Sequence, residues 1–192
     1  AQALALVEDR LERTPDDVGA LLTRARVHYL RDDVAAARAD LARVRGLEPA
    51  NAVAANSLVE LDLAAGDVAG ALAFAEAIAA LDPQLGAALK SRVLFADGRP
   101  QEAVAVATAL QAERPSPEAA RLLFLVRRQA GFEAEAIAGL RSWVQRNPVD
   151  VQALDFLSQA LILEGEYRQA GRYLEQALRF VPSDPTLLNN LA

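Results

Sequence analysis

Residues 151–184 carry the pattern that decides the fold: VQALDFLSQALILEGEYRQAGRYLEQALRFVPSD. Apolar side chains recur at the spacing of one helix face, at Leu154, Leu157 and Leu161. Gly165 supplies the positive φ that a tight turn between two helices often needs. Pro182 cannot continue a helix and helps to end one. The stretch therefore predicts two helices joined by a tight turn and followed by a proline.

The same marks recur along the whole chain. Prolines separated by 34, 34, 32, 33 and 34 residues stand at Pro15, Pro49, Pro83, Pro115, Pro148 and Pro182. The residue twelve positions before each of them is alanine, at Ala3, Ala37, Ala71, Ala103, Ala136 and Ala170. The residue seventeen positions before is Asp32, Gly66, Gly98, Gly131 or Gly165. We expect Asp32 and the four glycines in the turns between helices. We expect the alanines where two helices of a hairpin cross, since a small side chain permits close approach. Pro100 is expected in the first turn of its helix.

A helix–turn–helix of this length with these marks resembles the tetratricopeptide repeat. The residues that fit the pattern in the last complete copy are Leu154, Leu157, Ser158, Leu161, Gly165, Tyr167, Ala170, Leu174, Ala177 and Pro182. The resemblance implies an all-α fold, a right-handed superhelical solenoid of helix–turn–helix hairpins. Pentatricopeptide repeats, which line a basic RNA groove, and the longer HEAT repeats fit less well.

The repeat predicts a single array over residues 1–192. Residues 1–17 form the second helix of a partial repeat, and 185–192 start a further repeat. The full repeats are 18–51, 52–83, 84–116, 117–150 and 151–184. Both ends fall inside the pattern rather than in a polar capping helix, so we expect a segment of a longer protein.

Repeat 117–150 departs from the pattern. Phe124 stands where a small residue is usual, and Arg127 where an apolar one is usual. The rigid Pro115-Ser116-Pro117 precedes both. We expect a local change of packing there.

Composition excludes several classes of function. The chain has no cysteine and one histidine, so disulfides, thiol catalysis, thiolate zinc sites and two-histidine metal sites are impossible. A Ser–His–Asp site would need His28, and no phosphate-binding loop or nucleophile elbow is present. We therefore expect no enzyme activity, no cofactor and no metal. The formal net charge of −6 argues against a nucleic-acid partner. The chain has no apolar run of about 18 residues, so no transmembrane segment is predicted in this portion.

In the resembled family the first helix of each hairpin faces the concave groove. Steps of four and three then pick the exposed side of each first helix. The peptide-binding candidates are Arg26, Tyr29, Asn56, Glu60, Leu63, Arg92, Phe95, Arg121, Leu125, Arg128, Asp155 and Gln159, with Asn189 in the partial repeat. Arginines fork carboxylates and aromatic rings anchor partners, so this surface suits a peptide of some acidic character. The alternative is a merely solvated helix face. A family clamp for C-terminal carboxylates needs lysine, and the single Lys90 lies off this face.

Polar residues also occupy first-helix positions that are usually apolar: Arg24, His28, Asp62, Lys90 and Arg127. Buried charges must be paired. We expect Asp62 to bridge cations on both neighbouring first helices, Arg24 or His28 on one side and Lys90 on the other. The alternative is that the long stems reach solvent. Trp143 has a core register in its helix.

The segment from Leu140 carries a second, narrower resemblance. Trp143 is followed by Asn147-Pro148 and Asp150, and the chain closes with Asn189-Asn190-Leu191-Ala192. These features look like the tetratricopeptide lipoproteins of Gram-negative bacteria that accompany exopolysaccharide biosynthesis and PEP-CTERM protein sorting. That resemblance implies a bacterial scaffold in the periplasm, anchored to the outer membrane or free.

The sequence thus predicts a non-catalytic protein–protein interaction scaffold that binds a peptide or protein segment in its groove. A cytoplasmic adaptor, or a regulatory module attached to an enzyme or sensor domain outside this segment, is the alternative. An RNA-binding solenoid is a third reading that the net charge opposes, although Arg26, Arg92, Arg121 and Arg128 could gather positive potential on one face. The partner's identity and the oligomeric state stay open.

Overall fold

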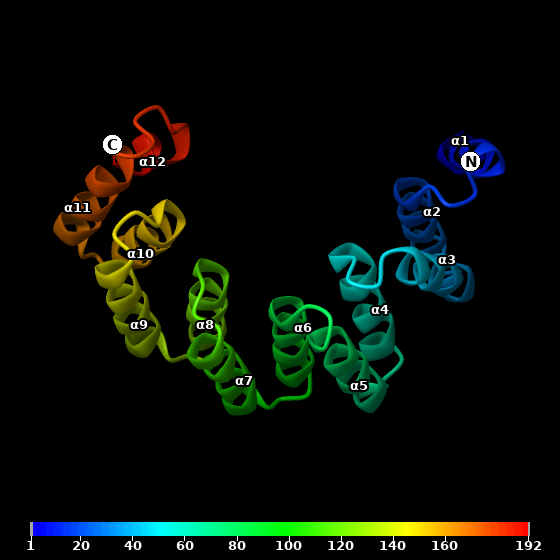
Figure 1. Cartoon of the computed structure of the whole chain (residues 1–192), viewed down its shortest axis with the longest axis horizontal. Coiled ribbons are helices and arrows are strands. Elements are labelled where there is room, and N and C mark those ends of the chain that lie inside the picture. The colour runs from blue at the N-terminus through cyan, green and yellow to red at the C-terminus, as the bar shows by residue number, and fades with distance from the viewer. Residues whose placement is uncertain (1, 192) are drawn as a thin grey trace. The chain divides into compact units, whose positions relative to one another are not determined.

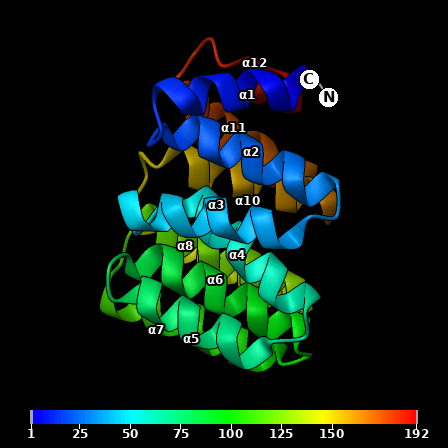
Figure 2. The same cartoon turned by 90° about the vertical axis from the view of Figure 1, so that its right-hand side faces the viewer.

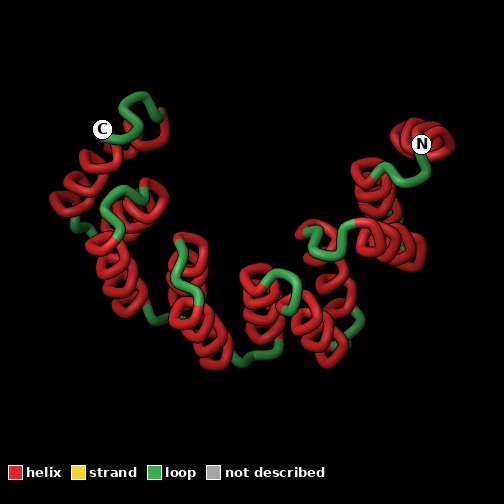
Figure 3. Tube along the Cα trace, viewed as in Figure 1, coloured by secondary structure: helices red, strands yellow, loops and turns green. Residues whose placement is uncertain are grey.

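The computed structural model describes residues 2–191, and the side chains of 4–191. Helices joined by short loops fill this range, and it contains no strand (Figures 1 and 3). The helices are α1 (Gln2–Arg13), α2 (Val18–Leu30), α3 (Val34–Leu47), α4 (Ala52–Ala64), α5 (Val68–Ala79), α6 (Pro83–Ala96), α7 (Pro100–Glu113), α8 (Pro117–Gln129), α9 (Glu133–Arg146), α10 (Val151–Leu163), α11 (Tyr167–Leu178) and α12 (Pro185–Leu191). The expected all-α solenoid of helical hairpins is confirmed. No helix in this range is long and apolar enough to cross a membrane.

The chain divides into two compact units, Ala1–Arg99 and Pro100–Ala192. In the first unit α2 packs on α3, α3 on α4, and α5 on both α4 and α6; the antiparallel pair α2 and α3 is plain in Figure 2. In the second unit α8 packs on α7 and α9, and α10 on α9 and α11. The division falls inside the expected repeat 84–116, ahead of the prolines where a change of packing was expected. The single array of residues 1–192 stays a prediction.

Side-chain caps explain where the helices begin. Each capping oxygen accepts the backbone N–H three residues further on, at 2.8–3.1 Å, in Asp17, Asp33, Asn51, Asp67, Asp82, Ser116 and Asp150. Such a bond satisfies one of the backbone donors that a helix start leaves free. Pro100 is the first residue of α7, as expected. Pro83 follows α5 but is itself the first residue of α6, where its missing N–H costs nothing.

The turns contain the residues that the repeat placed there. Asp32, Gly66, Gly98, Gly131 and Gly165 have φ values of 64–81°. Asp32 shows that aspartate can take this left-handed conformation, which most side chains avoid. The turn prediction is therefore confirmed at all five positions.

The repeated alanines are buried where helices meet. Ala37, Ala71, Ala103, Ala136 and Ala170 are at most 1% exposed, whereas the side chain of Ala3 lies outside the described residues. Helices approach still more closely at Gly86 of α6, where an added Cβ would lie 2.3 Å from the backbone of Ala79 in α5.

A hydrophobic core of the second unit joins residues of α8 to α12. It contains Trp143, which is 5% exposed, and Phe124, which is 3% exposed. The core position predicted for Trp143 is confirmed. The Trp143 indole donates to Asp150 Oδ2 at 2.7 Å, while Asp150 Oδ1 caps α10. Asn147 Nδ2 donates to the Trp143 carbonyl at 3.0 Å, so this segment is a local hydrogen-bonded corner.

Candidate functional site

The first helices α4 and α6 of the first unit bring three of the expected groove residues together. Arg92 Nη1 lies 3.2 Å from Asn56 Oδ1 and 3.4 Å from the Asn56 carbonyl. Arg92 Nη2 lies 3.5 Å from Glu60 Oε2. These contacts join side chains one helical turn apart on α4 to a side chain on α6. The helical register used to choose the candidates therefore places these three on one face.

A cavity of about 180 Å³ lies beside them, between α2, α3 and α4. Its walls include three predicted residues, Arg26, Tyr29 and Glu60. The residues that the sequence reasoning missed are Ala25, Ala37, Leu41, Ser57 and Leu61. The candidates came from first helices alone, whereas α3 is a second helix that forms one wall. The small side chains of Ala25, Ala37 and Ser57 are the sequence signal that could have indicated this cavity, because they leave the space between the helices open.

The charged residues in the wall of this cavity are Arg26 and Glu60. Arg26 is exposed, and within residues 4–191 its side chain makes no hydrogen bond or ion pair. The carboxylate of Glu60, on α4, already has a partner in Arg92, at 3.5 Å. Tyr29 keeps 43% of its surface exposed beside the cavity. A free guanidinium next to a half-exposed ring can bind a carboxylate and an apolar side chain together. We call Arg26, Tyr29, Asn56, Glu60 and Arg92 the first-helix face.

The other two candidates in this unit contribute less surface. Leu63 is partly buried and packs against the hydrophobic core of α4, α5 and α6. Phe95 is also partly buried.

Most candidate groove residues of the second unit already bond to neighbouring side chains. Arg128 pairs with Glu133 at 2.6 Å and its guanidinium lies 5.7 Å from the centre of the Phe124 ring. Asp155 accepts from Gln159 at 2.8 Å and from Asn190 at 3.3 Å. Asn190 thus contacts the preceding first helix, while Asn189 is exposed and its place in the groove stays a prediction.

Two candidates of the second unit remain open to solvent. Arg121 is exposed, and Leu125 is 41% exposed. Both lie on α8, one helical turn apart.

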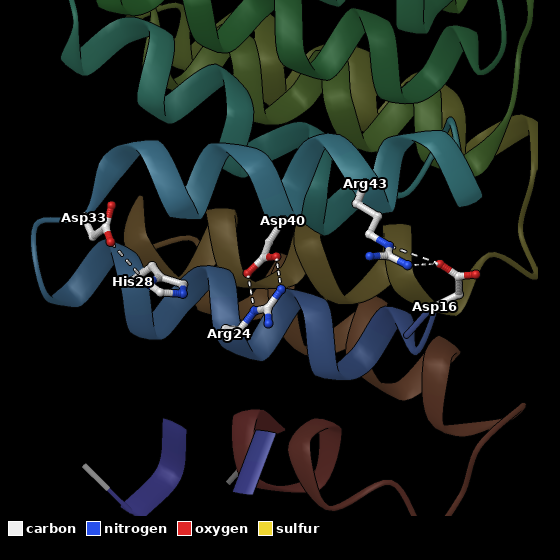
Figure 4. A network of polar contacts seen from close by, with 6 residues as sticks. All are labelled: Asp16, Arg24, His28, Asp33, Asp40 and Arg43. Carbon is white, nitrogen blue, oxygen red and sulfur yellow. Dashed lines mark hydrogen bonds and ion pairs between the residues drawn. The ribbon is translucent and has the colours of Figure 1, made fainter. Parts of the chain in front are cut away.

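A row of polar contacts crosses the α2–α3 hairpin (Figure 4). At its centre Arg24 Nε and Nη2 donate to Asp40 Oδ2 and Oδ1 at 2.8 and 2.7 Å. Asp40 is only 6% exposed. The hydrogen bonds to Asp40 raise the pKa of Arg24 above its ordinary value, although burial opposes the shift. The two outer pairs of the row are His28 Nδ1 with Asp33 Oδ2 at 3.5 Å and Arg43 with Asp16 at 2.8 Å.

The bridge expected at Asp62 is wrong. Asp62 pairs with Arg38 of α3 at 2.7 Å, and Lys90 pairs with Glu76 of α5 at 2.7 Å. The bond from Lys90 lowers the pKa of Glu76. The reason is geometric: α4 packs against α3 and α6 packs against α5, so the charges on these first helices meet second helices. Arg127 likewise reaches the second helix α9, donating to the Glu135 carbonyl at 3.2 Å.

Comparison with family models finds no match, and comparison with curated protein sequences finds none. Solved structures do match. PilW, a type IV pilus biogenesis factor, is 22% identical, with a TM-score of 0.54 over 100% of this chain and 90% of that chain. TTC0263, a tetratricopeptide repeat protein of Thermus thermophilus, is 19% identical, with a TM-score of 0.56 over 91% and 96%. A tetratricopeptide repeat protein of Parabacteroides merdae is 16% identical, with a TM-score of 0.55 over 99% and 75%. Likenesses at this level of identity show the fold.

Proposed function

We propose that this chain, which has the fold of tetratricopeptide repeat proteins, is a non-catalytic interaction scaffold that binds a peptide or protein segment on its first-helix face. The observation that carries the proposal is the cavity between α2, α3 and α4, with the unpaired Arg26 and the half-exposed Tyr29 beside it. Fold alone does not give function, so the proposal depends on these side chains.

The cavity's chemistry defines the partner we propose. Arg26 has no carboxylate partner among the described side chains, so an acidic residue of the ligand would complete it. Ala25 and Leu41 offer an apolar wall, and Tyr29 offers a ring edge. A peptide with an acidic residue next to an apolar one fits this combination, whereas nucleic acid does not fit a chain of net charge −6.

The experiment selects ligands without assuming their identity. A random-peptide phage library is selected against the immobilised 192-residue chain, and the recovered peptides are measured by fluorescence anisotropy. We expect the recovered peptides to be enriched in Asp or Glu. Arg26→Glu should weaken their binding by about tenfold or more, because it removes a charge-assisted bond and adds a repulsive charge.

The matched control is Arg179→Glu, which makes the same charge change at an exposed arginine in the second unit. It should leave affinity unchanged. If both variants weakened binding equally, the change in net charge would explain the effect and the proposal would fail. If the peptides bound equally well to wild type and Arg26→Glu, the proposal would also be contradicted. Failure to recover any binding peptide would contradict it as well.

We propose further that the scaffold works in the bacterial envelope, in the periplasm or anchored to the outer membrane, in exopolysaccharide secretion or protein sorting. The support is the resemblance of the segment around Trp143 and Asp150 to envelope lipoproteins, and the likeness in fold to PilW, which is described as a type IV pilus biogenesis factor. Fractionation of cells that express the tagged full-length gene tests this. Recovery in the periplasmic or outer-membrane fraction is expected, and recovery in the cytosol would favour the cytoplasmic adaptor or regulatory module.

A further inference from the structure

A second pocket lies in the second unit, and none of its lining residues belongs to the first-helix face. It has a volume of about 150 Å³ and lies between α7, α8 and α9. Phe124 and Leu140 contribute apolar wall, and Arg127, Arg146 and Gln111 contribute polar groups. Two of these residues, Phe124 and Arg127, are the ones that depart from the repeat pattern.

Arg127 is held in place by the backbone of α9. Its Nη1 donates to the Glu135 carbonyl at 3.2 Å. It passes directly over Gly139, where an added Cβ would lie only 2.7 Å from that nitrogen. No carboxylate among the described side chains pairs with Arg127. The guanidinium is therefore held at the pocket by the Glu135 carbonyl, in space that Gly139 leaves open because it has no side chain. Its charge is not neutralised by a carboxylate.

Arg146 brings a second guanidinium to the same pocket. Its Nε donates to the Ser142 carbonyl at 3.2 Å, and the group lies 5.9 Å from the centre of the Trp143 ring. No described carboxylate pairs with it either. By contrast, Arg128, the neighbour of Arg127 on α8, is neutralised by Glu133. Two unneutralised guanidinium groups at one pocket favour an anion.

The remaining groups narrow the anion's chemistry. The pocket residues lie within helices, so no free backbone N–H of a helix start is available for the phosphate contacts that such donors usually make. Planar guanidinium groups match a carboxylate, and the apolar wall matches a short aliphatic stem. Gln111 Oε1 is buried and has no hydrogen-bond donor among the described residues, so a ligand N–H would satisfy it.

We infer that this pocket binds an acidic amino-acid residue, with its carboxylate at Arg127 and Arg146, its stem against Phe124 and Leu140, and its N–H towards Gln111. The residue could be free glutamate or a glutamate within a protein segment, which offer the same carboxylate and stem. The site is independent of the first-helix face, since none of its residues belongs to that face.

Trp143 gives a direct readout, because it lines the pocket and is the only tryptophan. The test titrates the 15N-labelled 192-residue chain with N-acetyl-L-glutamate α-amide, and separately with free L-glutamate, while the indole N–H resonance is followed by NMR. Saturable displacement of this resonance is expected for at least one probe. Tighter binding of the blocked residue assigns the ligand to a protein segment, and tighter binding of free L-glutamate assigns it to the metabolite.

Variants and uncharged probes decide whether the stated groups bind the ligand. Arg127→Gln, and Gly139→Ala, which displaces Arg127, should each weaken binding by about tenfold or more. Arg179→Gln should leave it unchanged, and unaltered circular dichroism of each variant verifies its fold. Equal binding of N-acetyl-L-glutamine α-amide or of inorganic phosphate would overturn the assignment. So would full affinity in both pocket variants, or the lack of any saturable shift.

Discussion

At the residue scale, the stability of the first unit depends on the ion pair between Arg24 and the buried Asp40. Asp40 is 6% exposed, and both of its oxygens accept from Arg24. Removing one partner of a buried pair leaves an uncompensated charge, which lowers the free energy of unfolding more than replacing both partners does. Asp40→Ala should therefore lower the free energy of unfolding by about 2 kcal/mol in urea denaturation.

The control is the double variant Arg24→Met with Asp40→Leu, which removes both charges and keeps apolar volume. It should regain most of the lost stability. If the double variant were as unstable as Asp40→Ala, packing rather than the uncompensated charge would be the cause.

Asp17 makes the stability of the first unit depend on pH. The backbone N–H of Ala20 and then the side chain of Arg10 donate to it, and both lower its pKa below the ordinary value of about 3.9. A carboxylate with a lowered folded pKa stabilises the fold above its ordinary pKa, and this contribution is lost as pH falls through the folded value. Asp17→Asn keeps an N-cap acceptor but cannot ionise.

The melting temperature of Asp17→Asn should therefore fall less between about pH 6 and pH 3 than that of the wild type. Thermal scans at both pH values check this. Parallel curves for the two proteins would mean that Asp17 does not contribute to the pH dependence.

At the element scale, helix contacts set how much volume each position tolerates. Gly86 of α6 lies against Ala79 of α5, and a Cβ there would come within 2.3 Å of backbone. Gly86→Ala should therefore cost about 1–3 kcal/mol through overpacking. Gly46 of α3 is the matched control, since nothing lies within 4 Å of its Cβ position.

Gly46→Ala should raise stability by about 0.5–1 kcal/mol, because alanine is the better helix former. Chemical denaturation of both variants measures the difference. Stabilisation by Gly86→Ala would mean that α5 and α6 are packed less closely than the 2.3 Å distance at Gly86 implies.

Elements were predictable from the sequence because their determinants are local. Gly165 and its repeats set the turns by their own φ, and Pro100 and Pro117 begin helices by their lack of N–H. Partners of side chains were less predictable, because they depend on which helices pack together. Asp62 was therefore matched with the wrong cations, although its need for a partner was correctly inferred.

The candidate site shows the same division. Helical spacing found Arg26, Tyr29 and Glu60 on one side of the first helices. It could not find Leu41, because a second helix supplies that part of the wall. Nor could it show that Arg92 is already held by Glu60 while Arg26 is free, since that depends on the distances between helices.

At the scale of the whole molecule, stability should accumulate from neighbouring hairpins. In the second unit α10 packs on α8, α9 and α11, and α12 packs on α11. Deleting residues 151–192 removes α10, α11 and α12 but leaves the pairs α2–α3 and α8–α9.

Circular dichroism of this truncated chain should show a lower melting temperature but retained helical content. Trp143 fluorescence reports separately on α9 in the remaining part of the second unit. Loss of all helical signal after the deletion would contradict the nearest-neighbour description.

We propose that the first-helix face binds a peptide at the cavity beside Tyr29. The most direct measurement replaces Tyr29 with photoreactive benzoylphenylalanine, irradiates the chain with the selected peptides, and identifies cross-links by mass spectrometry. The control replaces Tyr167, which is 70% exposed and lies in the second unit. We predict peptide cross-links at position 29 and none at position 167. Equal cross-linking at both positions, or cross-linking at 167 alone, would contradict the claim.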